Sequence, residues 1–512
     1  MPSCDAIIIG GGSNGLACAF RLQASGRKVL VLEAHDDIGG AATARSGTIK
    51  LPLAHLLNKL DQRVEKSMDL SSHGVRWLNR NLATTALAAD GAHLILSGAA
   101  GETLEGNVSS EEQARWSALR ARLMRFAQLL APFKELPPPR LARHGGNNWM
   151  ALAQAGLRLR MMGKSEMREF MRLLLINVHD VLDDDLTHPL LKGVMAFDAT
   201  LGSWLGPRSP NSLILLLDRL AGQVDGTQAA LALPAGGVAS VTTAMAAAAR
   251  KAGVEIRTSA KVARIIVEGD RAVGVVLGHG EEIRAATIVS AISPKTTFLS
   301  LVGHGDLDTG FVNRIRHQKS RGAAAKLHLT LKTQPGFRGA DLATRLVIAP
   351  SPEAVEQSYN PVKYGEVPDA PVMEIIVPSA FAGETGEHRL SAIVQYAPHD
   401  PVMGKDKARK AMLANTLAQL ERHSPGIAKS VTHAELLMPY DIEEQYGMVG
   451  GNWHHGELSV EQMLFLRPVP GAARYATPLD GLWLASAGCH PGGGISGSAG
   501  WNAAEAIAGA RP

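Results

Sequence analysis

The chain has 512 residues, a formal net charge of +4 and three cysteines. This length exceeds what one hydrophobic core usually supports, so we expect two or more domains. The small net charge, without a basic cluster interleaved with aromatic residues, argues against nucleic-acid binding, and the isolated Cys4, Cys18 and Cys489 argue against a dithiol redox centre or a cysteine metal site.

The first predicted element is an apolar β-strand from Ala6 to Ile9, followed by Gly10-x-Gly12-x-x-Gly15 and a helical pattern. A second apolar strand, Val29 to Leu32, ends at Glu33. This order is that of a βαβ dinucleotide-binding unit, whose glycines allow a tight turn, close approach of a pyrophosphate and close packing of the helix on the strand. The Glu33 carboxylate can accept hydrogen bonds from both ribose hydroxyls and would repel a 2′-phosphate, so the unit predicts an adenosine nucleotide without that phosphate.

The start of this strand also bears on targeting. Because the strand begins close to residue 5 and no uninterrupted apolar run reaches spanning length, we expect neither a signal peptide nor a transmembrane helix. The isolated cysteines indicate a reducing compartment. We therefore expect a cytoplasmic protein.

The rest of the chain alternates between helical and strand-rich segments. A mainly helical region, 110–219, is followed by an Ala-rich helix and several short strands, and then by a region, 322–469, of strands and one long helix. The predicted elements after residue 230 are a helix over Val238–Ala252, strands over Glu255–Thr258, Val262–Glu268, Ala272–Leu277, Thr287–Ala291, Lys326–Leu331 and Val372–Val377, and a helix over Lys405–Glu421. We expect a discontinuous nucleotide-binding domain of residues 1–70, 228–300 and 470–512, and a second domain of residues 71–227 and 301–469.

The last predicted elements form a second motif. An apolar strand, Leu482 to Ala485, leads into the turn Gly488-Cys-His-Pro-Gly-Gly-Gly494 and a final helix from Gly497 to Ala510. A strand that opens a helix through small residues exposes backbone N–H groups to a polar ligand. With the first motif present, its expected ligand is the flavin end of the same cofactor, which predicts FAD.

These motifs resemble the phytoene-dehydrogenase-related flavoproteins, and most of all the branch that contains pyridine nucleotide-disulphide oxidoreductase domain-containing protein 2. The segments that carry the resemblance recur in the expected order: Gly10 to Gly40, Leu233 to Val238, the strand at Val262, Gly450 to Glu457, Arg467 to Pro470 and His490 to Gly494. The resemblance implies an α/β fold with a two-dinucleotide-binding, Rossmann-type FAD domain and a substrate domain like that of amine oxidases and carotene desaturases. No CxxC pair is present, so disulphide redox chemistry is not expected.

The resemblance also implies a set of cofactor contacts. Gly12, Ser13 and Asn14 would meet the pyrophosphate. Glu33, with Ala34 beside it, would meet the adenosine ribose, and the backbone of Val262 would hold the adenine. The residues implied for the remaining phosphate, ribityl and flavin contacts are Gly40, Ala41, Ala42, Gly488, Gly493, Gly494, Ile495 and Ser496. Ala41-Ala42 departs from the arginine that many amine oxidases carry there, which favours the desaturase-like branch.

Residues for substrate chemistry are harder to identify, because a flavin performs hydride transfer itself. His455 and His454 are the first candidates, since they lie between glycines on a predicted loop and histidine ordinarily titrates near neutral pH. His490, in the flavin-facing turn, is the third candidate. Structural hydrogen bonding is the alternative for all three, and His55 ranks below them. Adjacent side chains diverge and no carboxylate or cysteine cluster joins the His pair, so no metal site is expected.

The segment Gly156 to Arg172 carries five basic residues among Leu, Met and Phe. Their partial helical spacing is compatible with an amphipathic face that rests on a membrane. Such a pattern is more often a solvated helix face or a contact between subunits of a homo-oligomer.

Three functions remain open from the sequence. The first is an FAD-dependent dehydrogenase or oxidase that removes two hydrogens from a C–C or C–N bond of a small, mostly apolar substrate. The second is a non-redox isomerase or a saturase on the same fold. The third is a flavin-binding interaction protein without turnover.

Overall fold

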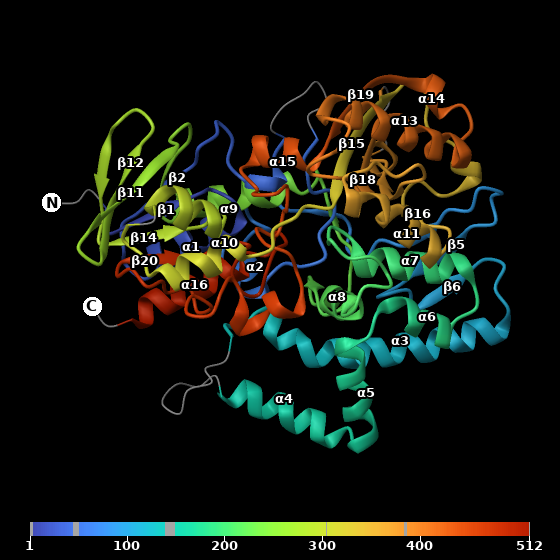
Figure 1. Ribbon diagram of the computed structural model, residues 1–512, viewed down its shortest axis with the longest axis horizontal. Helices are drawn as coiled ribbons and strands as arrows, with labels where there is room; N and C mark the ends of the chain where they lie inside the picture. The colour runs from blue at the N-terminus through green and yellow to red at the C-terminus, as the bar shows by residue number, and fades with distance from the viewer. Residues whose placement is uncertain (1–3, 45–50, 139–148, 304, 383–386, 511–512) are drawn as a thin grey trace.

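The computed structural model describes residues 4–44, 51–138, 149–303, 305–382 and 387–510. The fold is mixed α/β, as the sequence analysis predicts. In Figure 1 a parallel sheet and its helices lie at the left, a larger sheet lies at the upper right, and a group of helices lies below that sheet. The marked N- and C-termini both lie on the side of the parallel sheet.

The parallel sheet has five strands in the order β10-β2-β1-β14-β20. Its strands are β1 (Ala6–Ile9), β2 (Val29–Leu32), β10 (Glu255–Arg257), β14 (Thr287–Ser290) and β20 (Leu482–Leu484). All residues of β1 and β2 are buried, which is expected for a parallel sheet covered on both faces. Apart from β1 and β2, neighbouring strands of this sheet come from segments far apart in the chain.

Three helices pack beside this sheet, namely α1 (Ser13–Gln23), α9 (Ala239–Lys251) and α16 (Ser498–Gly509). A β-carbon added at Gly500 of α16 would lie 1.8 Å from the Asn14 carbonyl oxygen of α1. The two helices therefore meet at a distance that only glycine allows. A three-stranded antiparallel sheet, β11 (Val262–Glu268), β12 (Arg271–Leu277) and β13 (Glu282–Arg284), follows β10 in the chain.

The larger sheet has eight strands in the order β19-β15-β18-β17-β16-β4-β5-β6. Its strands are β4 (Thr84–Ala86), β5 (Leu94–Ser97), β6 (Thr103–Glu105), β15 (Ala324–Leu331), β16 (Arg345–Ile348), β17 (Val372–Ile376), β18 (His388–Gln395) and β19 (Val431–Leu437). Of the strands in this larger sheet, the sequence analysis predicts only those within 322–469, because strands as short as β4, β5 and β6 show too little alternation to be recognised. Helix α13 (Lys405–His423) packs on this sheet through Ala408, Met412 and Leu420.

The predicted helical region contains α3 (Ser110–Leu130), α4 (Trp149–Met161), α5 (Lys164–Leu175), α6 (Val178–Asp185), α7 (Pro189–Thr200) and α8 (Ser212–Leu220). The remaining helices are α2 (Gln62–Ser67), α10 (Thr309–His317), α11 (Pro352–Tyr359), α12 (Ser379–Ala382), α14 (Ile427–Ser430) and α15 (Pro439–Tyr446). Two short ladders complete the fold: β3 (Trp77–Asn79) with β9 (Leu233–Pro234), and β7 (Gln223–Val224) with β8 (Thr227–Gln228). None of the described helices is both long and apolar enough to span a membrane.

The contact between α1 and α16 gives a first prediction. Gly500→Ala should destabilise the protein by about 1–3 kcal/mol or more, because overpacking displaces α16 from α1. Gly509→Ala is the matched control, since a β-carbon there meets nothing within 4 Å. Chemical denaturation of both variants checks the prediction, and equal stability of the two would contradict it.

Candidate functional site

One cavity of about 760 Å³ extends from the parallel sheet to helices α7 and α8 and strand β17. Its wall includes the turn after β1, the end of β2, the start of β11 and the segment 53–59. Residues of α7, α8 and β17, the loop 453–455 and the turn 493–495 complete it. The cavity therefore unites the two glycine-rich motifs of the sequence with residues from the middle of the chain.

The glycines after β1 have the geometry that the dinucleotide motif predicts. Gly10 has a φ of 100°, which an L side chain rarely adopts, and a β-carbon at Gly15 would lie 2.0 Å from the Gly10 carbonyl oxygen. A β-carbon at Gly12 would meet only the Gly40 α-carbon, 4.0 Å away. Gly12 caps α1 without a side-chain hydrogen bond, so the first N–H groups of the helix remain available to an anionic ligand.

Glu33 lies at the end of β2 and is 6% exposed. One carboxylate oxygen accepts a hydrogen bond from the Gly11 N–H at 2.8 Å, and the other accepts one from the His35 N–H at 3.1 Å. Glu33 and Ala34 both line the cavity, as does Val262 at the start of β11. Because a carboxylate oxygen can accept more than one hydrogen bond, the arrangement is compatible with an adenosine ribose.

Most of the other predicted cofactor contacts also line the cavity: Gly10, Ser13, Asn14, Gly40, Ala41, Ala42, Gly493, Gly494 and Ile495. Three predicted contacts are not among the lining residues. Gly15 and Gly488 serve close packing instead, since a β-carbon at Gly488 would lie 2.5 Å from the Pro294 side chain. Ser496 is fully buried, and its carbonyl accepts a hydrogen bond from the Asp61 N–H.

His454 and His455 both lie in the cavity wall. The Trp453 indole N–H donates to Nε2 of His454 at 3.0 Å, and the Nδ1 atoms of both histidines are buried without a hydrogen-bond partner among the described residues. Both residues of the cavity wall therefore carry a buried ring nitrogen that has no hydrogen-bond partner among the described residues. The backbone of His455 is held at a φ of 55°, a conformation that the surrounding loop must stabilise.

Burial changes the acid–base properties of this histidine pair. Burial, together with the nearby Arg467 guanidinium, lowers the pKa of His454 to about 3 and that of His455 to about 4. The expectation that these histidines titrate near neutral pH is therefore wrong for the protein in this state. Both rings are neutral at pH 7, which is the form that can accept a proton.

His490 is placed differently from the other two histidine candidates. Its ring Nε2 bonds the Leu136 carbonyl at 3.1 Å, so this nitrogen carries the proton and donates it. His490 is not among the residues that line the cavity. Burial lowers its pKa to about 3. These contacts correspond to the structural alternative in the sequence analysis rather than to a catalytic role.

Arg467 organises the loops that carry these histidines. Its guanidinium is buried and donates hydrogen bonds to five backbone carbonyls, those of His454, Gly456, Glu457, Gln462 and Ala487. Burial lowers the pKa of Arg467 to about 10. One side chain thus connects the histidine loop with the segment that leads into the C-terminal glycine-rich turn.

Lys59 is a site residue that the sequence reasoning missed. It lines the cavity, it is 5% exposed, and its Nζ has no hydrogen-bond partner among the described residues. Burial and the neighbouring Lys134 hold the pKa of Lys59 well below its usual value. Lys134 itself is paired with Asp218 at 2.5 Å. No local motif marks Lys59, because its surroundings come from distant parts of the chain.

His55 begins a second polar group at the cavity wall. Its Nε2 lies 2.9 Å from a Glu374 carboxylate oxygen, and its Nδ1 lies 3.0 Å from Nζ of Lys326. Arg345 pairs with Glu374 at 2.7 Å and with Asp198 at 2.5 Å. Burial lowers the pKa of His55 to about 4 and that of Lys326 to about 7. This buried network joins the segment 53–59 to the eight-stranded sheet.

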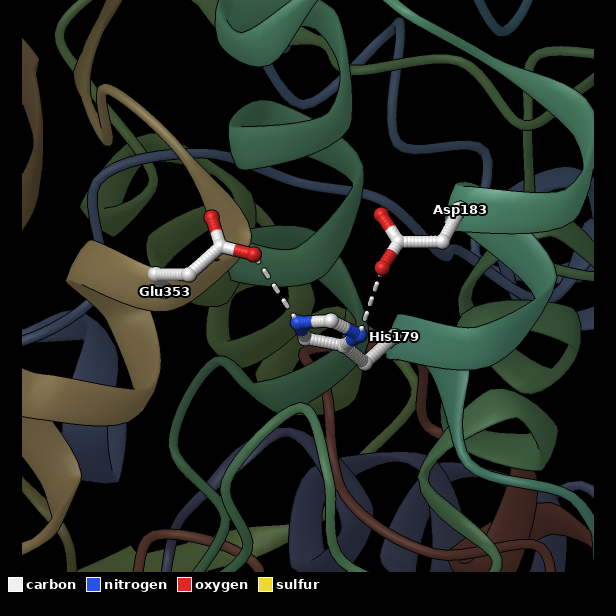
Figure 2. Close-up of side chains that lie close together, drawn as sticks. All are labelled: His179, Asp183 and Glu353. Carbon is white, nitrogen blue, oxygen red and sulfur yellow. Dashed lines mark hydrogen bonds and ion pairs between the residues drawn. The ribbon is translucent and has the colours of Figure 1, made fainter.

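A third polar cluster lies outside the cavity and consists of His179, Asp183 and Glu353 (Figure 2). Asp183 lies 3.2 Å from Nδ1 of His179 and Glu353 lies 3.1 Å from Nε2, so the two carboxylates flank the ring from opposite sides. Lys192 pairs with Asp183, and Arg208 approaches Nε2 of His179. The ligand atoms are already engaged by one another and by cations, so the cluster connects α6 with α11 rather than forming an open ligand set.

Comparison with known proteins agrees with this geometry. A family described as FAD binding domain matches residues 5–293. The pyridine nucleotide-disulfide oxidoreductase domain-containing protein 2 of Rattus norvegicus is 30% identical over 99% of this chain and 93% of its own length. A component of the limonene dehydrogenase of Castellaniella defragrans is 25% identical over 99% of this chain and 95% of its own length, and hydroxyneurosporene desaturase of Cereibacter sphaeroides is 26% identical over 98% and 97%.

A solved structure shares the fold over nearly the whole chain. Putrescine oxidase, in a structure with bound putrescine, superposes with a TM-score of 0.62 at 16% sequence identity and covers 99% of this chain and 98% of its own. At this identity the likeness shows the fold alone. It corresponds to the predicted arrangement of an FAD-binding domain with a substrate domain.

The contacts of Glu33 give the second prediction. Glu33→Gln removes the charge that strengthens hydrogen bonds to ribose hydroxyls, so the Kd for FAD should rise roughly tenfold to a hundredfold. Titration of apoprotein with FAD, followed by flavin fluorescence, measures this change. Glu255→Gln, an exposed carboxylate on the adjacent strand β10, is the control that should leave the Kd unchanged. An unaltered Kd in Glu33→Gln would remove Glu33 from the ribose site.

Proposed function

This chain belongs to the FAD binding domain family, and from that premise we propose that it is an oxidoreductase that removes two hydrogens from a C–C or C–N bond of a small, mostly apolar substrate. The observation that carries the proposal is the continuity of one cavity from Gly12 and Glu33 to the buried, neutral His454 and His455. A nucleotide site and an unprotonated base in one enclosed space are what such a reaction requires.

The bound flavin supplies the hydride acceptor in this proposal. The protein contributes a site that binds the substrate and excludes water, with Leu201, Leu215 and Ile393 among its apolar lining residues. Several charged lining residues form pairs, such as Lys134 with Asp218 and Arg219 with Asp198, which reduces the charge that they present to an apolar substrate. The names of limonene dehydrogenase and hydroxyneurosporene desaturase support a substrate of this kind.

His455 is the proposed acceptor of the proton that leaves with the hydride. Its side chain lines the cavity, its Nδ1 is unpartnered among the described residues, and its ring is neutral at pH 7. Lys59 is the second candidate, because its buried amine is also unpartnered among those residues and its lowered pKa favours the neutral form. His454 is less suited, since its Nε2 already accepts the hydrogen of the Trp453 indole.

The role of His455 gives the third prediction. His455→Ala should slow flavin reduction by roughly a hundredfold or more, the usual effect of losing a positioned base. A base acts only when unprotonated, so the wild-type rate should be constant around neutral pH and should fall as the pH drops through about 4. Stopped-flow absorbance with substrate in excess, across pH, measures both effects.

Lys59→Met provides the comparison for that experiment. Each variant must retain bound FAD and its melting temperature for the rates to be compared. If Lys59→Met loses the rate while His455→Ala keeps it, the base is Lys59. A wild-type rate that titrates near neutral pH would also contradict the assignment to His455.

The fourth prediction tests the reaction itself. Some apolar compounds with a C–C or C–N single bond that can be oxidised should bleach the flavin of the FAD-loaded protein under anaerobic conditions. Mass spectrometry should then find a product two mass units lighter than the compound added. A product of unchanged mass would identify an isomerase. A substrate that gains two mass units, and only with reduced protein, would identify a saturase. Loaded protein that no compound in a broad panel bleaches would favour a binding protein without turnover.

We also propose that the protein works in the cytoplasm. Cys18 and Cys489 are buried free thiols, and burial raises the pKa of Cys18 to about 12 and that of Cys489 to about 11. Such thiols are unreactive, and free thiols are typical of a reducing compartment.

A further inference from the structure

Helices α4 and α5 form a hairpin at the edge of the helical region. In Figure 1 they lie at the bottom of the view, below α3 and α8. The turn between them contains Gly163, which has a φ of 90°. Phe170 and Leu173 of α5 are buried and attach the hairpin to the helical core. The opposite side of α5 is therefore left toward solvent.

That outer side carries large apolar residues. Met167, Met171 and Leu175 follow one another at intervals of four residues and so share one face of α5, and all three are exposed. On α4, Leu157 and Met161 have the same spacing, and Met161 is 75% exposed. Of the exposed large hydrophobic residues in the described part of the chain, these five are concentrated in one short segment. Such a concentration marks an interaction surface.

Basic residues surround these apolar side chains. Arg158, Arg160, Lys164 and Arg168 are exposed, and none has an ion-pair partner among the described residues. The acidic residues of α5 are engaged, because Glu166 pairs with Arg125 and Glu169 pairs with Arg172. The outer face of the hairpin is thus both apolar and positively charged.

A second cavity, of about 370 Å³, lies between this hairpin and the main cavity. Arg158 of α4 contributes to its wall. Lys59 and Lys134 line both cavities, so these two side chains form their common boundary. The second cavity therefore adjoins both the hairpin and the candidate site.

We propose that the outer face of the α4–α5 hairpin binds the surface of an anionic lipid bilayer. Apolar side chains between cations match the boundary between acyl chains and anionic headgroups. Arg158 belongs to this face and also lines the second cavity, so a bilayer bound there would lie beside that cavity. A route for a lipophilic substrate from there past Lys59 and Lys134 rests on the proposed function, whereas the binding to lipid does not.

A second copy of the chain is a poorer occupant of this face. In a symmetric dimer the same patch meets itself, which would bring Arg158, Lys164 and Arg168 against their own copies. Like charges in such contact oppose association. An anionic surface has no such conflict.

The test is co-sedimentation of the full-length, FAD-loaded protein with phosphatidylcholine vesicles that contain about 30% phosphatidylserine, a fraction chosen to mimic an anionic cytoplasmic leaflet. The wild-type protein should sediment with these vesicles, should bind pure phosphatidylcholine vesicles at least tenfold more weakly, and should dissociate as salt is raised. The variant Arg158→Glu/Lys164→Glu/Arg168→Glu should bind the anionic vesicles at least tenfold more weakly. Met161→Ser/Met171→Ser/Leu175→Ser should also weaken binding, because its charge is unchanged and its apolar contact is lost.

The matched control is Arg250→Glu/Lys251→Glu/Lys407→Glu, which makes the same change in net charge at exposed residues outside the hairpin. It should bind the anionic vesicles within about twofold of wild type, and all variants should keep their FAD content. A control that loses binding as much as the hairpin variant would overturn the proposal. So would wild-type protein that stays in the supernatant.

A concentration-dependent dimer that the hairpin substitutions abolish, without lipid binding, would make the face a contact between two copies of the chain and would also overturn the proposal. The vesicle assay needs no substrate, so its outcome is independent of the bleaching experiment. Vesicle binding without any substrate that reduces the flavin would leave the lipid surface in place and remove the proposed function alone.

Discussion

The candidate site depends on the burial of one guanidinium. Arg467 is 1% exposed, and its hydrogen bonds within the described part of the chain go to backbone carbonyls rather than to a carboxylate. A buried charge must be satisfied by hydrogen bonds, so the carbonyls have to converge on it. These carbonyls belong to the histidine loop and to the segment before the C-terminal turn. The hydrogen bonds to Arg467 therefore fix the positions of two cavity walls relative to each other. The positive φ of His455 is maintained within the same loop.

Close approach between backbones is the second constraint on the cavity. Gly15 lets α1 pack on the turn after β1, Gly500 lets α16 pack on α1, and Gly493 lets the turn meet the ring of His454, whose Nδ1 would lie 2.1 Å from an added β-carbon. Each contact joins elements that a side chain would separate. The shape of the cavity wall therefore depends on glycines at these contacts as well as on the side chains that line the cavity.

The sequence predicts the elements around the first glycine-rich motif because they are local. The strand, turn, helix and acid of residues 6–33 follow one another, and the strand at Val262–Glu268 is found with its observed bounds because its β-branched residues and the following Gly269 mark it. The rest of the site cannot be read in this way. The cavity brings together Lys59, His55 and Glu374 from segments far apart in the chain, so no sequence motif predicts that they share a site.

The histidines illustrate the same limit. Their positions in glycine-rich segments are visible in the sequence, but their protonation is set by burial, which only the fold determines. The sequence groups His490 with His454 and His455 because it lies in the glycine-rich turn. The direction of its ring depends on the Leu136 carbonyl, which is distant in the chain. The local sequence therefore identifies candidate histidines, whereas the protonation and hydrogen bonding of each ring depend on the folded environment.

The contact of α16 with α1 has a consequence for the order of events during synthesis. Ribosomes add roughly 5–20 residues per second, so the β1–α1 unit emerges well before β20, the glycine-rich turn and α16 are made. Until then the nucleotide pocket lacks its closing wall, and the surface of α1 that Gly500 later covers faces solvent. Stable retention of the cofactor is therefore a late event in the life of each molecule, and a ribosome that stalls before the final helix leaves a nascent chain with an open pocket.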